Sequence, residues 1–238
     1  MADTSATATA VNVFTSPGEA FAAIKERPSA WLPILLLIAG IAAVTFVYMT
    51  SVDLPWFFET QLEAAANADL SAEEREQAAE RAASVSPLVY AAIGTVTSSV
   101  SFLVVSLLGA LYYTGVSFLT HDGVKFKQWF ALLCWCSLPL MVGLVAQLVH
   151  LLSTDARFLM QDEINPFSFG NLLSIDRTGL TIVQRILLGL DVTVVWCLVL
   201  TVLGYQAFSK SSLGKAVAVV LGPLVVVVAV STALALAR

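Results

Sequence analysis

The stretch WLPILLLIAGIAAVTFVYM, at residues 31–49, contains no charged residue. Because an α-helix rises about 1.5 Å per residue, a run of this length crosses about 30 Å of hydrocarbon. A second uncharged run, AVAVVLGPLVVVVAVSTALALA at residues 216–237, is equally long and apolar. Neither run alternates apolar and polar residues as the strands of a membrane barrel do. Both runs therefore predict helices that span a membrane.

The composition of the whole chain indicates the same class of protein. Of its 238 residues, 58% are hydrophobic and 12% are charged, whereas a soluble domain carries about 25% charged residues. The net charge of −5 disfavours a nucleic-acid partner, since phosphates attract an excess of Lys and Arg. The cysteines, Cys134, Cys136 and Cys197, lie in apolar runs with no metal-ligand pattern around them. We therefore predict neither a metal site nor a cofactor.

The apolar runs predict an all-α fold, an integral membrane bundle of five transmembrane helices over residues 31–238. An N-terminal segment, residues 1–30, precedes this domain and holds an interfacial amphipathic helix. Small residues recur along the second span, which predicts close helix packing, either within the bundle or between copies of the chain. The predicted spans are 31–50, 88–118, 129–153, 184–207 and 216–237.

The distribution of lysines predicts the orientation in the membrane. All five lysines lie in short segments that alternate to one side, while the loops 51–87 and 154–183 on the other side are rich in acids. The positive-inside rule then predicts a cytoplasmic N-terminus and an outside, or periplasmic, C-terminus. Four of these lysines are candidates for docking a partner or contacting anionic lipid: Lys125, Lys127, Lys210 and Lys215.

The segment SPGEAFAAIKE, at residues 16–26, has the signals of a short amphipathic helix. Ser16 is a predicted N-cap, Pro17 suits the first helical position, and Glu19 would complete a capping box. We expect this helix to lie in the inner headgroup region, with Phe14 and Phe21 dipping into the membrane. A second capping box, Ser71 with Glu74, is predicted in the outer loop.

Ionisable and polar residues at membrane depth are the candidate functional residues. They are Asp191 and Arg185 in the predicted fourth span, with Gln147 and His150 in the third. One hypothesis is a polar relay or small-ligand site, and the other, which the residues favour, is an aspartate that holds helices together by hydrogen bonds. No nucleophile–base or metal constellation accompanies them, so we predict no catalytic residue and no enzyme.

Two motifs resemble those of a known family. FTSPGEAFAAI, at residues 14–24, and LGLDVTVVWCLVLTVLGYQAFSKSSLGKA, at residues 188–216, are similar to the opening and closing signatures of bacterial members of the Yip family, the Ypt/Rab-interacting membrane proteins. The matching positions of the closing signature are Asp191, Trp196, Gly204, Ser211 and Lys215.

The resemblance implies a multi-pass protein of the bacterial inner (cell) membrane. Eukaryotic members bind Rab GTPases and other Yip proteins, and some bacterial members work beside ABC-type export systems. The predicted function is thus a non-enzymatic accessory or scaffolding protein. Its expected partners are the lipid bilayer, other membrane proteins such as an ABC-type exporter, and a second copy of the chain. The alternative is a small-solute or ion transporter or channel that uses a polar site around Asp191.

Overall fold

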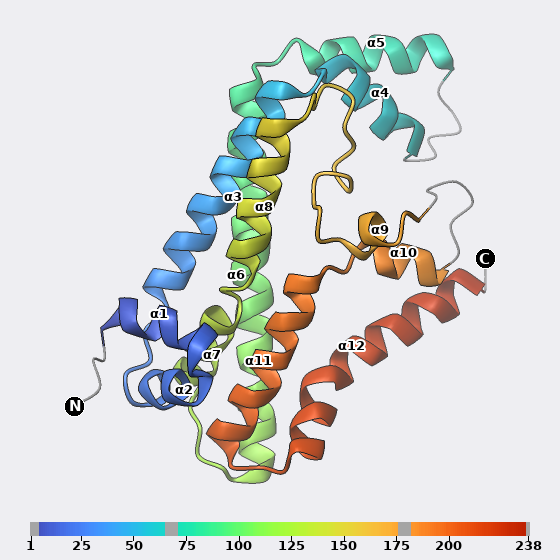
Figure 1. Ribbon diagram of the computed structural model, residues 1–238. Helices are drawn as coiled ribbons and strands as arrows, with labels where there is room; N and C mark the ends of the chain where they lie inside the picture. The colour runs from blue at the N-terminus through green and yellow to red at the C-terminus, as the bar shows by residue number, and fades with distance from the viewer. Residues whose placement is uncertain (1–4, 65–70, 176–181, 237–238) are drawn as a thin grey trace.

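The computed structural model describes residues 5–64, 71–175 and 182–236 (Figure 1). Within these ranges the chain forms twelve helices and, apart from one isolated bridge between Ser168 and Asp191, no β-structure. Five stretches are long and apolar enough to cross a membrane, which confirms the predicted all-α bundle of five spans. They are α3 (Trp31–Ser51), α6 (Pro87–Thr120), α7 (Phe126–Cys136) together with α8 (Leu140–Ser153), α11 (Val192–Ser209) and α12 (Leu213–Leu236).

The remaining helices are short and lie outside the five candidate spans (Figure 1). At one end, α4 (Leu54–Ala64) and α5 (Ala72–Ala83) pack against each other, and the predicted capping box of Ser71 and Glu74 is confirmed. On the same side, α9 (Phe169–Leu172) packs against α10 (Ile182–Leu188). Nearer the opposite end, α1 (Ala6–Thr15) and α2 (Pro17–Glu26) pack against α7 and, through α2, against α11.

The predicted fourth span, 184–207, begins too early. Helix α10 ends at Leu188, Gly189 forms a turn, and α11 begins only at Val192 with Asp191 as its N-cap. The physical reason is the aspartate itself, because its side chain accepts the backbone N–H of Val194 and so starts a helix instead of continuing one. Arg185 and Asp191 consequently belong to different helices.

The expectation for the N-terminal helix was also wrong in part. Helix α2 does begin at Pro17, but the side chain of Ser16 makes no capping bond. Phe21 does not dip into the headgroup region, since it is buried together with Ile24 in the main hydrophobic cluster of the protein. Apolar contact with α7 and α11 therefore replaces the expected contact with lipid. The additional helix α1, which the sequence reading did not predict, precedes α2.

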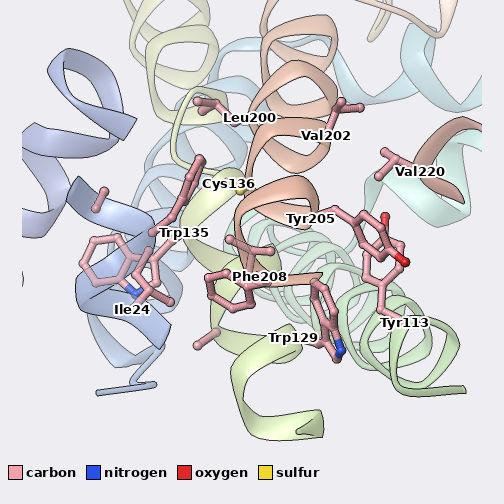
Figure 2. Packing of buried hydrophobic residues seen from close by; sticks show 14 of the residues in the cluster. Ile24, Tyr113, Trp129, Trp135, Cys136, Leu200, Val202, Tyr205, Phe208 and Val220 are labelled. Carbon is pink, nitrogen blue, oxygen red and sulfur yellow. The ribbon is translucent and has the colours of Figure 1, made fainter. Parts of the chain in front are cut away.

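Two hydrophobic clusters hold the bundle, one toward each end. The larger joins α2, α6, α7, α11 and α12, and Figure 2 shows its aromatic part, in which Trp129 and Phe208 lie close to Tyr113 and Tyr205. The smaller joins the second half of α3 to α4, α6, α8 and the loop after α8. Close packing within the bundle uses several of the small residues: a Cβ on Gly204 would lie 2.6 Å from Leu132 Cδ1.

Helix α12 is interrupted by Pro223, and Figure 1 shows it bending away from the bundle. Proline has no N–H, so the carbonyl of Val219, four residues earlier, loses its helical partner. The hydroxyl of Tyr112 on α6 donates a hydrogen bond of 3.0 Å to this carbonyl. The tyrosine therefore satisfies the acceptor that the proline leaves open, at a depth where water is scarce.

We predict that Tyr112→Phe destabilises the protein by about 1–2 kcal/mol, since the Val219 carbonyl is left without a donor. In a Pro223→Ala background, the alanine N–H restores the helical bond, and Tyr112→Phe then has a much smaller effect. Reversible unfolding in mixed micelles measures all four proteins of this double-mutant cycle. Equal effects of Tyr112→Phe in both backgrounds would show that the two residues are uncoupled.

Candidate functional site

Helix α2 is fixed to the bundle by Lys25. Its ammonium Nζ donates to the backbone carbonyl of Phe208 at 2.5 Å and lies 5.5 Å from the centre of the Phe208 ring. The carbonyl belongs to the last turn of α11, where no intrahelical N–H is left to bond it. A cation at this position also opposes the negative end of the helix dipole and contacts the face of an aromatic ring. One side chain thus caps a helix that is distant in the sequence.

Further bonds extend this attachment along the chain. Gln128 Nε2 donates to the carbonyl of Lys25 at 2.8 Å, and the indole of Trp135 donates to the carbonyl of Ser29 at 2.7 Å. Phe14 meets Trp196 of α11 edge to face, with 5.3 Å between the ring centres. The opening motif and the closing motif therefore pack directly against each other.

An aromatic cluster joins three spans (Figure 2). Trp129 of α7 stacks on Tyr205 of α11 at 5.2 Å between ring centres and contacts Tyr113 of α6 at 5.4 Å. Its indole N–H donates to the hydroxyl of Ser117 at 2.9 Å, so its polar atom is satisfied although the side chain is fully buried. The cluster gives the attachment site of α2 a rigid base.

The four candidate lysines lie in two loops at the same end of the bundle (Figure 1). The loop between α6 and α7 carries Lys125 at its end, with Lys127 in the first turn of α7. The loop between α11 and α12 carries Lys210, and Lys215 follows in the first turn of α12. All four side chains are exposed. Their contact with headgroups or a partner stays a prediction, while the Lys25 side chain bonds within the protein.

Asp191 organises the polar region at membrane depth. Its Oδ1 accepts the Val194 N–H at 2.8 Å and the Thr193 hydroxyl at 2.6 Å, and its Oδ2 accepts the Asn165 side-chain amide at 2.8 Å. Backbone bonds from Val192 to Phe167 and from Phe169 to Leu190 run beside it. The carboxylate therefore ties the loop after α8 to the start of α11. Asn165 was not among the predicted residues, although the turn signal Asn165-Pro166 marks it.

Of the other predicted polar residues, the structure brings one to Asp191. Gln147 lines a cavity of about 170 Å³ together with Asp191 and Thr193, and it also lines an adjoining cavity of about 190 Å³. His150 lies one turn further along α8, half-exposed and outside the lining of both cavities. The side chain of Arg185 lies outside the described part of the structure.

The side chains around Asp191 are arranged for hydrogen bonding and do not form a coordination sphere for a metal ion. Among the described residues, no three His, Cys, Asp or Glu side chains come close enough to hold a metal ion. The three cysteines are unpaired thiols inside the spans. The fold and these contacts define a helical membrane protein whose N-terminal helical pair is docked on its penultimate span.

A model of the Yip1 domain matches residues 11–235. The match covers nearly the whole chain and includes both motifs, so this chain belongs to the Yip family. Comparisons with curated proteins and with solved structures find no match. Membership confirms the family resemblance and places the chain among multi-span membrane proteins that interact with other proteins.

We predict that Lys25→Met destabilises the protein by about 1–2 kcal/mol, because the last turn of α11 loses a charged donor at its C-terminus. Methionine keeps the length of the side chain and its contact with Phe208. The matched control is Lys127→Met, since Lys127 is an exposed lysine in the first turn of a helix at the same end. Thermal unfolding in detergent measures both variants, and equal melting temperatures for them would contradict the capping role.

Substitution of Asp191 separates a structural role from a chemical one. Asp191→Ala removes the N-cap of α11 and the Asn165 bond, and we expect a loss of about 1–2 kcal/mol. Asp191→Asn keeps an acceptor for the Val194 N–H and should lose less than half of that. Unfolding in mixed micelles gives both values. If the alanine variant is as stable as the native protein, the structural role of Asp191 is contradicted.

Proposed function

We propose that this protein is a non-enzymatic accessory or scaffolding protein of the bacterial inner membrane. It holds another membrane protein through the face formed by α1 and α2. The observation that carries the proposal is the attachment of this helical pair, which lies outside the spans and is fixed by the Lys25–Phe208 bond. A surface of fixed shape loses little conformational entropy when it binds, so it favours a defined partner.

The exposed side of the pair has the mixed character of a protein interface. Val11 is 57% exposed and Phe14 is 39% exposed, and the charged side chains of Glu19 and Arg27 are also exposed. A few apolar side chains inside a polar rim are typical of transient interfaces. An ABC-type export system is the partner class we propose, following the family resemblance of the two motifs.

The proposed orientation places this face in the cytoplasm. The exposed lysines of both loops lie at the end of the bundle toward which α1 and α2 pack, whereas α4 and α5 at the other end carry an excess of exposed acids, including Glu59, Glu73 and Glu80. The positive-inside rule assigns the lysine end to the cytoplasm. The C-terminus is then periplasmic.

A photocrosslinking amino acid at position 11 tests the proposal in native membranes. We expect one defined membrane protein to be captured from Val11, and capture to fall when Lys25→Met loosens the helical pair. The matched control places the same amino acid at Val226, an exposed position on α12. Capture of lipid alone at both positions would overturn the proposal, and capture of a second copy would replace the accessory role by self-assembly.

Transport of a small solute or ion is the second candidate, and the cavity shared by Asp191, Gln147 and Thr193 favours it. The carboxylate there already accepts three hydrogen bonds, which supports the accessory function more than transport. Solute flux in proteoliposomes that Gln147→Leu abolishes without loss of stability would establish transport instead.

A further inference from the structure

A long groove runs between α6 and α12, at the point where Pro223 turns α12 away from the bundle. Its volume is about 830 Å³, several times that of either polar cavity, and its lining is almost entirely apolar. Phe102, Val105 and Leu108 form the wall on α6, while Val220, Pro223 and Val227 form the wall on α12. The groove is lined by residues of α6, α7, α8 and α12, which are all parts of the candidate spans, and lipid is therefore the solvent expected around it.

Of the five hydroxyl groups in the lining, those of Ser106, Ser137 and Tyr112 are bonded to backbone carbonyls. Ser106 donates to the carbonyl of Phe102 at 2.8 Å, and Ser137 donates to the carbonyl of Leu133 at 2.9 Å. Tyr112 donates to the carbonyl of Val219. Because each of these hydroxyls bonds to backbone, the surface suits a hydrocarbon chain better than water.

The length of the groove corresponds to one leaflet. Its lining on α6 extends from Ser101 to Tyr113, which is about 18 Å of helix at 1.5 Å per residue. One leaflet contributes half of a hydrocarbon core of about 30 Å, or about 15 Å. Tyr113 is toward the lysine end of α6, so the groove occupies the leaflet on the lysine side.

Two lysines follow in sequence just beyond the end of the groove wall on α12. Lys215 lies five residues before Val220, the first groove residue of α12, and its side chain is exposed. Lys210, also exposed, lies in the adjacent loop between α11 and α12. An apolar groove one leaflet deep, with two exposed lysines near the start of one of its walls, is complementary to an anionic phospholipid.

We infer that this groove binds one anionic phospholipid of the lysine-side leaflet. An acyl chain lies between α6 and α12, and the phosphate contacts Lys215 and Lys210. The inference does not depend on the accessory function, because it concerns a different face of the protein.

The test uses the full chain reconstituted in vesicles of phosphatidylcholine with a minor fraction of phosphatidylglycerol. Native mass spectrometry after extraction in mild detergent counts the lipids that remain bound. We expect one retained lipid, enriched in phosphatidylglycerol over its share of the vesicle. Lys215→Ala, and separately Lys210→Asn, should each lower that enrichment about fivefold, the contribution of one lysine near an anionic surface.

Matched variants distinguish the contribution of the groove to lipid retention from that of the lysine charges. Val227→Trp fills the groove and should abolish retention of both lipids, while Val226→Trp, at an equally exposed neighbouring position outside the lining, should leave it unchanged. Lys125→Ala with Lys127→Ala controls for charge in the other loop. Retention in proportion to vesicle composition, or retention that Val227→Trp does not change, would overturn the inference. If Val227→Trp abolishes lipid retention but the lysine variants leave the enrichment in phosphatidylglycerol unchanged, the preference for an anionic headgroup is refuted.

Discussion

The bond from Lys25 to the carbonyl of Phe208 connects a segment that precedes the first span to the end of the fourth. Without it, the last turn of α11 would expose an unpaired carbonyl beside a buried aromatic cluster, and α2 would be held by its apolar contacts and by the bond from Gln128 to the carbonyl of Lys25. With it, Phe21 and Ile24 are kept against α7 and α11, and Gln128 can reach the backbone of Lys25. The N-terminal pair is therefore part of the folded bundle.

A second constraint is the requirement that backbone polar groups be satisfied where water is absent. Two breaks in regular helix show how this is met. Tyr112 bonds the carbonyl that Pro223 leaves open in α12. Asp191 plays the same part where α11 starts. These partners allow bends, and the bend of α12 in turn creates the lipid groove.

The candidate polar site shows which of its residues the sequence pattern could predict and which it could not. Asp191 and Gln147 were selected because ionisable and polar groups at membrane depth need an explanation, and the structure does bring them to one cavity. Asn165 and Thr193, which bond the aspartate, could not be found in this way, because their importance comes from a loop that folds back onto α11. His150 was selected on sequence depth alone, and its direction around α8 takes it away from the cavities.

The sequence alone determined the membrane class, the five spans and the family, because uncharged runs of about 20 residues can be stable only as helices in a bilayer. It also indicated the starts of two short helices, at Pro17 and after Ser71, since such signals are local. The tertiary structure decided that α2 packs on protein instead of lipid, that Asn165 bonds Asp191, and that Tyr112 compensates Pro223. These outcomes depend on contacts between residues distant in the chain, such as Lys25 and Phe208, which no local pattern encodes.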